Sequence, residues 1–144
     1  MIVKYEPAVF NSLMHFNQAK MLVGDLTESI SKLGEVIKKF NLNFAGVALL
    51  HKHFDITEDE VLVENEADST SEVYPKPVAD YEEGSLTPYM WKVTETGKLA
   101  PLEFTSSKDQ KISTRIEEVC SSVQFLKEFS ALVKELQVIH FFSN

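Results

Sequence analysis

The stretch LNFAGVALLHKHFDITEDEVLVEN, residues 42–65, decides the fold that this sequence predicts. Seven residues in a row, from Phe44 to Leu50, carry no charge, a pattern typical of a strand that is buried on both faces. The polar run DITEDE follows, and apolar residues return after Glu60. Together these segments predict an antiparallel hairpin over about 44–65.

A second hairpin is predicted over about 88–104, because two apolar segments flank a turn that contains Gly97. Pro101 lies in its second strand. Since proline has no N–H to donate, Pro101 indicates a sheet edge or a β-bulge. Short strands are expected near both ends of the sequence, at about 2–5 and 138–142, and the first of these segments also fits an ordered arm.

Three helices are predicted, at about 7–23, 26–40 and 110–136. In the middle helix the apolar residues step along the sequence by four and three, which places them on one stripe. Asn41 or Asn43 can adopt the left-handed conformation that ends a helix. The last helix has a wide apolar stripe that can pack on a sheet or on other helices, seat a partner's helix, or form a homodimer with a second copy of itself.

These elements predict an α+β fold with a single domain over residues 1–144. In this prediction an antiparallel sheet, built from the two hairpins and the terminal strands, carries the helices on one face. The length and the hydrophobic fraction of 44% allow a sizeable core without disulfides. Cys120 is the one cysteine, which suits a reducing compartment such as the cytoplasm. It lies on or beside the apolar stripe of the last helix and is expected to be inert.

The charge balance disfavours polyanionic partners. The chain has 22 acidic and 14 basic residues and a net charge of −8, and its one arginine is Arg115. Neither nucleic acid nor a membrane is therefore expected as a partner. No apolar run approaches the roughly 18 residues that a membrane span needs.

A long acidic loop is predicted at about 66–84 and is expected to be mobile. Its charge makes it the expected docking surface for a basic protein partner, and exposed aromatic residues beside it would anchor such an interface. For Trp91 a place in the core is the favoured alternative. The residues assigned to this interaction surface are Tyr74, Tyr81, Glu82, Glu83, Tyr89 and Trp91.

His51 and His53 are the strongest candidates for chemistry. On an extended strand they would project to the same side, about 6–7 Å apart at their roots, so that both rings can bind one divalent metal ion. Asp55 continues the same alternation, and His140 would supply a third nitrogen if its strand lies alongside. The alternative, which we favour, is a pair of histidines at the end of a strand that are hydrogen-bonded, packed on aromatic rings or exposed.

The spacing Gly46-x4-His51-x-His53-x4-Glu58 loosely resembles the first metal motif of the cupins. The resemblance covers about thirteen residues and would imply a divalent metal in a small β-barrel. The glycine spacing is one residue short, the later glycine is absent, and nothing in the sequence resembles the second cupin motif. Two long helices also fit poorly with such a barrel.

Two functional hypotheses follow. The first is a non-enzymatic protein-interaction domain, such as an adaptor, an inhibitor or an assembly subunit, with no catalytic residue and no cofactor. It is favoured by the acidic loop and by the absence of a Gly-x-Ser-x-Gly elbow and of a glycine-rich phosphate loop. The alternative is a small-molecule or divalent-metal-binding protein, with a hydrolase or an isomerase among its forms, built around His51 and His53.

Overall fold

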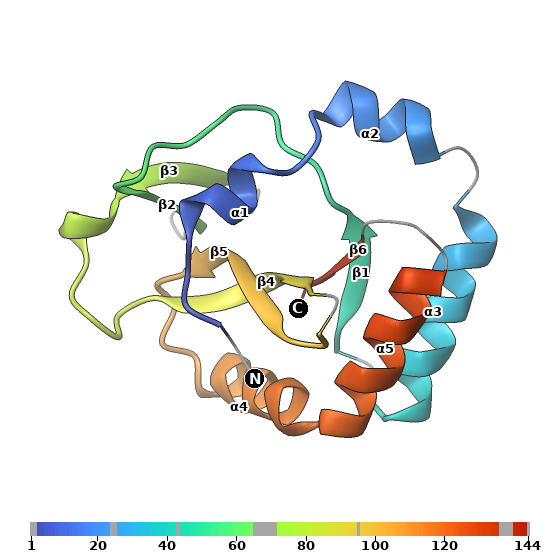
Figure 1. Cartoon of the computed structure of the whole chain (residues 1–144). Coiled ribbons are helices and arrows are strands. Elements are labelled where there is room, and N and C mark those ends of the chain that lie inside the picture. The colour runs from blue at the N-terminus through green and yellow to red at the C-terminus, as the bar shows by residue number, and fades with distance from the viewer. Residues whose placement is uncertain are drawn as a thin grey trace.

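The computed structural model describes residues 3–23, 26–42, 44–64, 72–94, 96–135 and 140–143. These residues form an α+β domain in which one six-stranded sheet carries helices (Figure 1). In chain order the elements are α1 (Pro7–Asn11), α2 (Phe16–Val23), α3 (Thr27–Lys39), β1 (Gly46–Leu49), β2 (Glu60–Glu64), β3 (Val73–Pro77), the 3-10 helix η1 (Val78–Asp80), β4 (Thr87–Val93), β5 (Leu99–Thr105), α4 (Gln110–Ser121), α5 (Val123–Glu135) and β6 (His140–Ser143).

The sheet has the strand order β1-β6-β4-β5-β2-β3. The α+β class of the domain confirms the prediction. The sheet is mixed rather than antiparallel, because β2 and β5 run parallel. The hairpin predicted over 44–65 is wrong, because β1 pairs with β6, whereas β2 pairs with β3 and β5. The ten residues that connect β1 to β2 can extend to roughly 33 Å. Four strand spacings amount to about 19 Å, so this connection can pass over the strands between them.

The hairpin predicted over 88–104 is confirmed as the antiparallel pair β4 and β5. Its register shifts twice. Pro88 and Met90 face Phe104 and Glu103, which leaves Tyr89 as an extra residue in β4. Met90 and Trp91 face Glu103 and Pro101, which leaves Leu102 as an extra residue in β5, and each extra residue directly follows a proline.

Helices α3, α4 and α5 form the main core with one face of the sheet. Helix α5 contacts both α3 and α4, and α3 also contacts β1. The fully buried side chains of this core are Leu33, Trp91, Leu99, Val119, Phe125 and Phe129. Helix α3 confirms the helix predicted at 26–40, and Asn41, with a φ of 58°, follows its end as expected.

A second apolar cluster lies on the opposite face of the sheet, under α1. It consists of Phe10, Leu13, Leu50, Ile56, Leu62 and Leu102. Met90 packs against this cluster, while its neighbour Trp91 belongs to the main core, as adjacent residues of a strand project to opposite faces. The expectation that all helices cover one face is therefore wrong.

Both outer helices of the prediction are interrupted. The helix predicted at 7–23 is divided into α1 and α2, because Lys52 forms backbone hydrogen bonds of 2.9 Å with Met14 O and with the Phe16 N–H. The helix predicted at 110–136 is divided at Ser122, whose ψ of 78° is not helical. Residue 136 lies outside the described residues.

The segments near the two ends take different roles. Residues 3–6 form an arm rather than a strand, and the Val3 N–H donates a hydrogen bond of 2.9 Å to Leu99 O. The strand predicted at 138–142 is confirmed for its described part as β6, which lies inside the sheet between β1 and β4. Within the described ranges, no helix is long and apolar enough to cross a membrane.

Replacing glycine by alanine should have opposite effects on stability at positions 97 and 34. Gly97 has a φ of +77°, and an added Cβ would lie 3.4 Å from Ser130 Oγ, so Gly97→Ala should lower the free energy of unfolding by about 1–2 kcal/mol. Gly34 lies inside α3 with open space around it, so Gly34→Ala should raise that free energy by about 0.5–1 kcal/mol. Urea unfolding of both variants checks the pair, and equal effects would contradict the assignment of the turn and the helix.

Candidate ligand pocket

A cavity of about 360 Å³ lies between the N-terminal part of the chain and the face of the sheet that carries Met90. This face is called the pocket face below. Its size is at the lower end of the range for small-molecule sites, about 300–1,000 Å³. Most of its lining is apolar and includes Phe10, Leu13, Leu50, Leu62, Met90 and Leu102. The polar side chains that line it are His51, Lys52, His53 and Glu103.

His51 and His53 do not lie on a strand, because β1 ends at Leu49. The predicted alternation is therefore wrong for this pair. Their rings nevertheless lie together, edge to face, with centroids 5.0 Å apart. Phe16 packs against both rings, at centroid distances of 4.9 Å from His51 and 5.2 Å from His53. A phenylalanine of α2 thus holds together two histidines that the backbone alone would not align.

The hydrogen bond of His51 fixes its tautomer. Nδ1 lies 2.9 Å from Leu49 O, and a carbonyl oxygen can only accept, so Nδ1 carries the hydrogen. In the neutral ring this leaves Nε2 as an acceptor. Within the described part of the chain, no hydrogen bond occupies that nitrogen or either nitrogen of His53. His51 therefore brings an oriented acceptor to the lining of the pocket.

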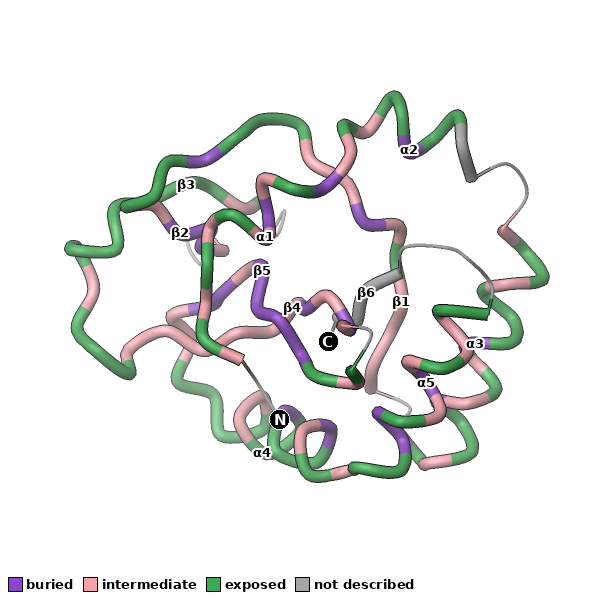
Figure 2. The backbone as a smooth tube through the Cα atoms, viewed as in Figure 1, coloured by how far each residue is buried: buried purple, intermediate pink, exposed green. Residues whose placement is uncertain are grey.

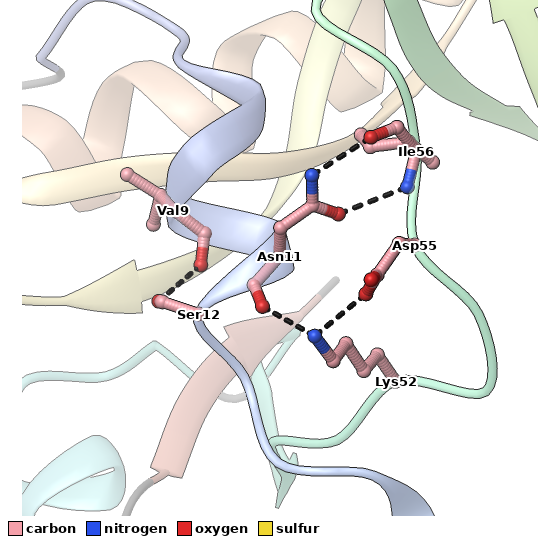
Figure 3. Close-up of polar contacts among 6 residues, drawn as sticks. All are labelled: Val9, Asn11, Ser12, Lys52, Asp55 and Ile56. Carbon is pink, nitrogen blue, oxygen red and sulfur yellow. Dashed lines mark hydrogen bonds and ion pairs between the residues drawn. The ribbon is translucent and has the colours of Figure 1, made fainter.

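The segment that carries the histidines is tied to the end of α1 by a clamp of polar contacts (Figure 3). The Asn11 side chain donates from Nδ2 to Ile56 O at 2.7 Å and accepts from the Ile56 N–H at 2.9 Å. Lys52 Nζ donates to Asn11 O and to Asp55 Oδ1, the latter at 2.6 Å. Since each such bond contributes about 0.5–1.5 kcal/mol, the clamp holds the 50–56 segment over the sheet without a strand ladder.

Asp55 is occupied by this clamp. Its exposed carboxylate pairs with Lys52, and the hydrogen bond from Lys52 lowers its pKa. Asp55 does not line the pocket with the two histidines, and among the described residues no group of three His, Cys, Asp or Glu side chains could hold a metal ion. His140 is opposite Leu49 in the register of β6 with β1, so its strand does lie alongside; its side chain is outside the described part.

Glu103 is the pocket residue that sequence analysis missed. Glu103 is partly exposed, whereas every other residue of β5 is buried. Figure 2 shows that most of the β5 strand is buried. Its Oε2 accepts a hydrogen bond of 3.0 Å from the Tyr89 hydroxyl. Burial is the main cause that raises the pKa of the Glu103 carboxyl; Glu64 raises it further, while Tyr89 and His51 act in the opposite direction. The carboxyl thus lies in an apolar setting within the electrostatic reach of His51.

The β-bulges explain how Glu103 reaches the pocket. Leu102 and Glu103 are neighbours in sequence, yet both line the cavity, because the extra residue at Leu102 interrupts the alternation of β5. Pro101, which indicated a bulge, was the available signal in the sequence. Tyr89, the extra residue of β4, is also drawn into this site: burial and the charge of Glu103 raise the pKa of its hydroxyl far above the usual range.

Of the residues assigned to interaction, Tyr89 contacts a pocket residue, and the others do not line the cavity. Trp91 is fully buried in the main core, which is the alternative that the sequence favoured for this residue. The Tyr89 hydroxyl donates a hydrogen bond to Glu103. Tyr74 is 40% exposed on β3, and Tyr81 is half-buried beside the exposed Glu82 and Glu83. The acidic loop predicted at 66–84 contains β3 and η1, and residues 65–71 lie outside the described part.

Comparisons with known proteins add no relatives. No protein-family model matches the chain, and no curated protein or solved structure is significantly similar to it. Any functional conclusion therefore has to be based on the geometry of the chain itself.

Replacing Glu103 by Gln is predicted to stabilise the protein at pH 7. The folded-state pKa of Glu103 is raised, so its ionised form costs stability above that pKa, and this cost disappears below the unfolded-state pKa of about 4.3. Gln keeps an acceptor for Tyr89. Urea unfolding should show a gain at pH 7 that vanishes near about pH 3.5. Glu83→Gln, at an exposed position, is the control; a loss of stability in Glu103→Gln at pH 7 would contradict the assignment.

Proposed function

We propose that this protein binds a small, largely apolar molecule in the pocket, with His51 as the group that orients the ligand. The observation that carries the proposal is the joint lining of one cavity by apolar side chains and a histidine with a fixed tautomer. Such a combination of apolar walls and a few convergent polar groups is typical of small-molecule sites. This is the second of the two functions compatible with the sequence.

The walls of the pocket are held in place before a ligand enters, which favours ligand binding. Its floor belongs to the sheet, and its roof is fixed by the clamp between Asn11, Lys52 and Ile56, so little ordering is required when a ligand enters. His53 lies next to His51 and adds a second ring with no hydrogen bond in the described part of the chain. A reaction that moves a proton, as in an isomerase or a hydrolase, would use the same Nε2 of His51.

Filling the mouth of the pocket tests this function. Ala48 is exposed on β1 and lines the cavity, so Ala48→Phe should block it at little cost to folding. Phenethyl alcohol serves as an uncharged probe, with an expected Kd on the order of 1 mM for so small a ligand. In NMR titrations it should shift the methyl signals of Leu50 and Leu102 in the unmodified protein and not in Ala48→Phe.

Ala131→Phe is the matched control, because Ala131 is exposed on α5 and does not line the pocket. This variant should bind the probe as well as the unmodified protein does. Binding that persists in Ala48→Phe, or shifts that appear mainly outside the pocket, would refute the proposed site.

We infer a second candidate function, in protein interaction, from the surface over 72–83. Tyr74 and Val78 are 40% and 45% exposed there, next to the exposed acids Asp80, Glu82 and Glu83. Exposed aromatic and apolar groups within an acidic surface suit a basic peptide. The apolar stripe of the last helix gives no such support for a homodimer, since its main residues are buried in the core of the same chain.

An eight-lysine peptide tests the 72–83 surface. At low ionic strength it should shift the amide signals of 72–83 while the pocket signals stay unchanged, and the double variant Glu82→Gln, Glu83→Gln should weaken these shifts. Glu117→Gln with Glu118→Gln, a pair of exposed acids on α4, is the matched control. Equal shifts over the whole surface would mean attraction by net charge alone and would contradict a specific surface.

The place of action that we propose is the cytoplasm. The chain has a single cysteine, and Cys120 is half-buried in α4. Burial raises the pKa of its thiol, which lowers the fraction of reactive thiolate at neutral pH. A thiol of this kind persists in a reducing compartment without serving as a nucleophile.

A further inference from the structure

We propose that the ligand of this pocket is an amine with an apolar body, whose ammonium group is bound by the carboxylate of Glu103. This inference rests on the proposed small-molecule function and goes further, because it names the charge of the ligand and the residue that selects it. It is based on the position of Glu103 in the cavity, on the occupancy of its two oxygens and on the charges around it.

One oxygen of Glu103 is available to a ligand. Oε2 accepts from the Tyr89 hydroxyl at 3.0 Å, and within the described residues no hydrogen bond involves Oε1. The one buried side-chain polar atom without a partner in that part of the chain is Trp91 Nε1, so Oε1 is not sealed inside the protein. A carboxylate in apolar surroundings with one unpaired oxygen is costly, and a bound cation would offset this cost.

The charges around the pocket favour a cation. Glu64 lies near enough to raise the pKa of both Glu103 and Tyr89, and it is in register with Val73, which lines the cavity. The lysine of the lining, Lys52, is already paired with Asp55 and with Asn11 O. An anionic ligand would therefore meet the Glu103 carboxylate, with the charge of Glu64 acting on it, and a lysine that is already paired. An ammonium group would instead meet a carboxylate oxygen that has no hydrogen-bond partner among the described residues.

His51 supplies a second acceptor for the same ammonium group. Its Nδ1 is fixed as a donor to Leu49 O, so Nε2 of the neutral ring can accept a hydrogen bond. His51 and Glu103 line the same cavity. Two acceptors suit an ammonium group, which has several N–H donors, and the apolar walls suit a hydrocarbon body.

Three probes with the same aromatic skeleton separate charge from shape. Phenethylamine, phenethyl alcohol and hydrocinnamate are cationic, neutral and anionic at pH 7, and each can be titrated into the protein in about 150 mM salt to screen non-specific attraction. We expect the amine to bind at least about tenfold more tightly than the alcohol, because a hydrogen bond to a charged group is stronger than a neutral one. Hydrocinnamate should bind more weakly than the alcohol.

The Glu103→Gln variant tests the assigned residue. It keeps the size of the side chain and the acceptor for Tyr89, and the urea measurement described above verifies that it folds. Its affinity for phenethylamine should fall about tenfold or more, while its affinity for phenethyl alcohol stays unchanged. Glu117→Gln removes the same charge from an exposed position on α4 that does not line the pocket, and it should leave both affinities unchanged.

The outcomes distinguish the two proposals. If the alcohol binds the unmodified protein at least as tightly as the amine does, or if Glu103→Gln binds the amine without loss, the amine assignment is overturned while the pocket function stands. If none of the three probes shifts the signals of the pocket residues, both proposals fail together.

Discussion

Pro88 and Pro101 constrain the middle of the sheet, because neither can donate an N–H to a neighbouring strand. β4 and β5 both have neighbours on two sides, which is an unusual place for proline. Among the described residues, Pro88 is in register with Phe104 alone and Pro101 with Trp91 alone. Each proline is followed by an extra residue that shifts the register, so the two strands absorb their prolines as a pair of bulges.

The two faces of the sheet have different covers. On one face, α3, α4 and α5 seal a core around Trp91 and Leu99, both fully buried. On the pocket face, the cover is α1, which has five residues, and the 50–56 segment, which the polar clamp holds. Such a short cover fills the space less completely than three helices do. A cavity therefore remains beside the point where the register shift presents Glu103.

The parts of the fold that local signals determine were predictable from the sequence. The apolar stripe predicted α3, and the Gly97 turn predicted the β4–β5 hairpin, because both depend on residues close together in the chain. The pairing of β1 with β6 joins residues that are far apart in sequence, such as Leu49 and His140, which are 91 positions apart, and it leaves no local period. The break before α2 likewise depends on backbone hydrogen bonds from Lys52, far along the chain from Met14.

The candidate site was predictable only in part, for a related reason. His51 and His53 were identified by residue type, but Phe16 and not a strand brings their rings together. Glu103 in the run LEF has the alternation of an ordinary solvent-facing strand residue, and only the bulge beside Pro101 places it in the cavity.

Trp91 and Glu103 show why access decides which polar group of this sheet can serve a ligand. Trp91 Nε1 is buried without a partner in the described part of the chain, which costs roughly 1–3 kcal/mol. No ligand can reach it through the sealed core, so this cost is the same in every state of the folded protein. On the opposite face, burial disfavours the ionised form of Glu103 and raises its pKa, but Glu103 borders a cavity. A cation that enters the cavity would offset the free-energy cost of burying the ionised carboxylate. That offset would contribute to the binding free energy of the cation.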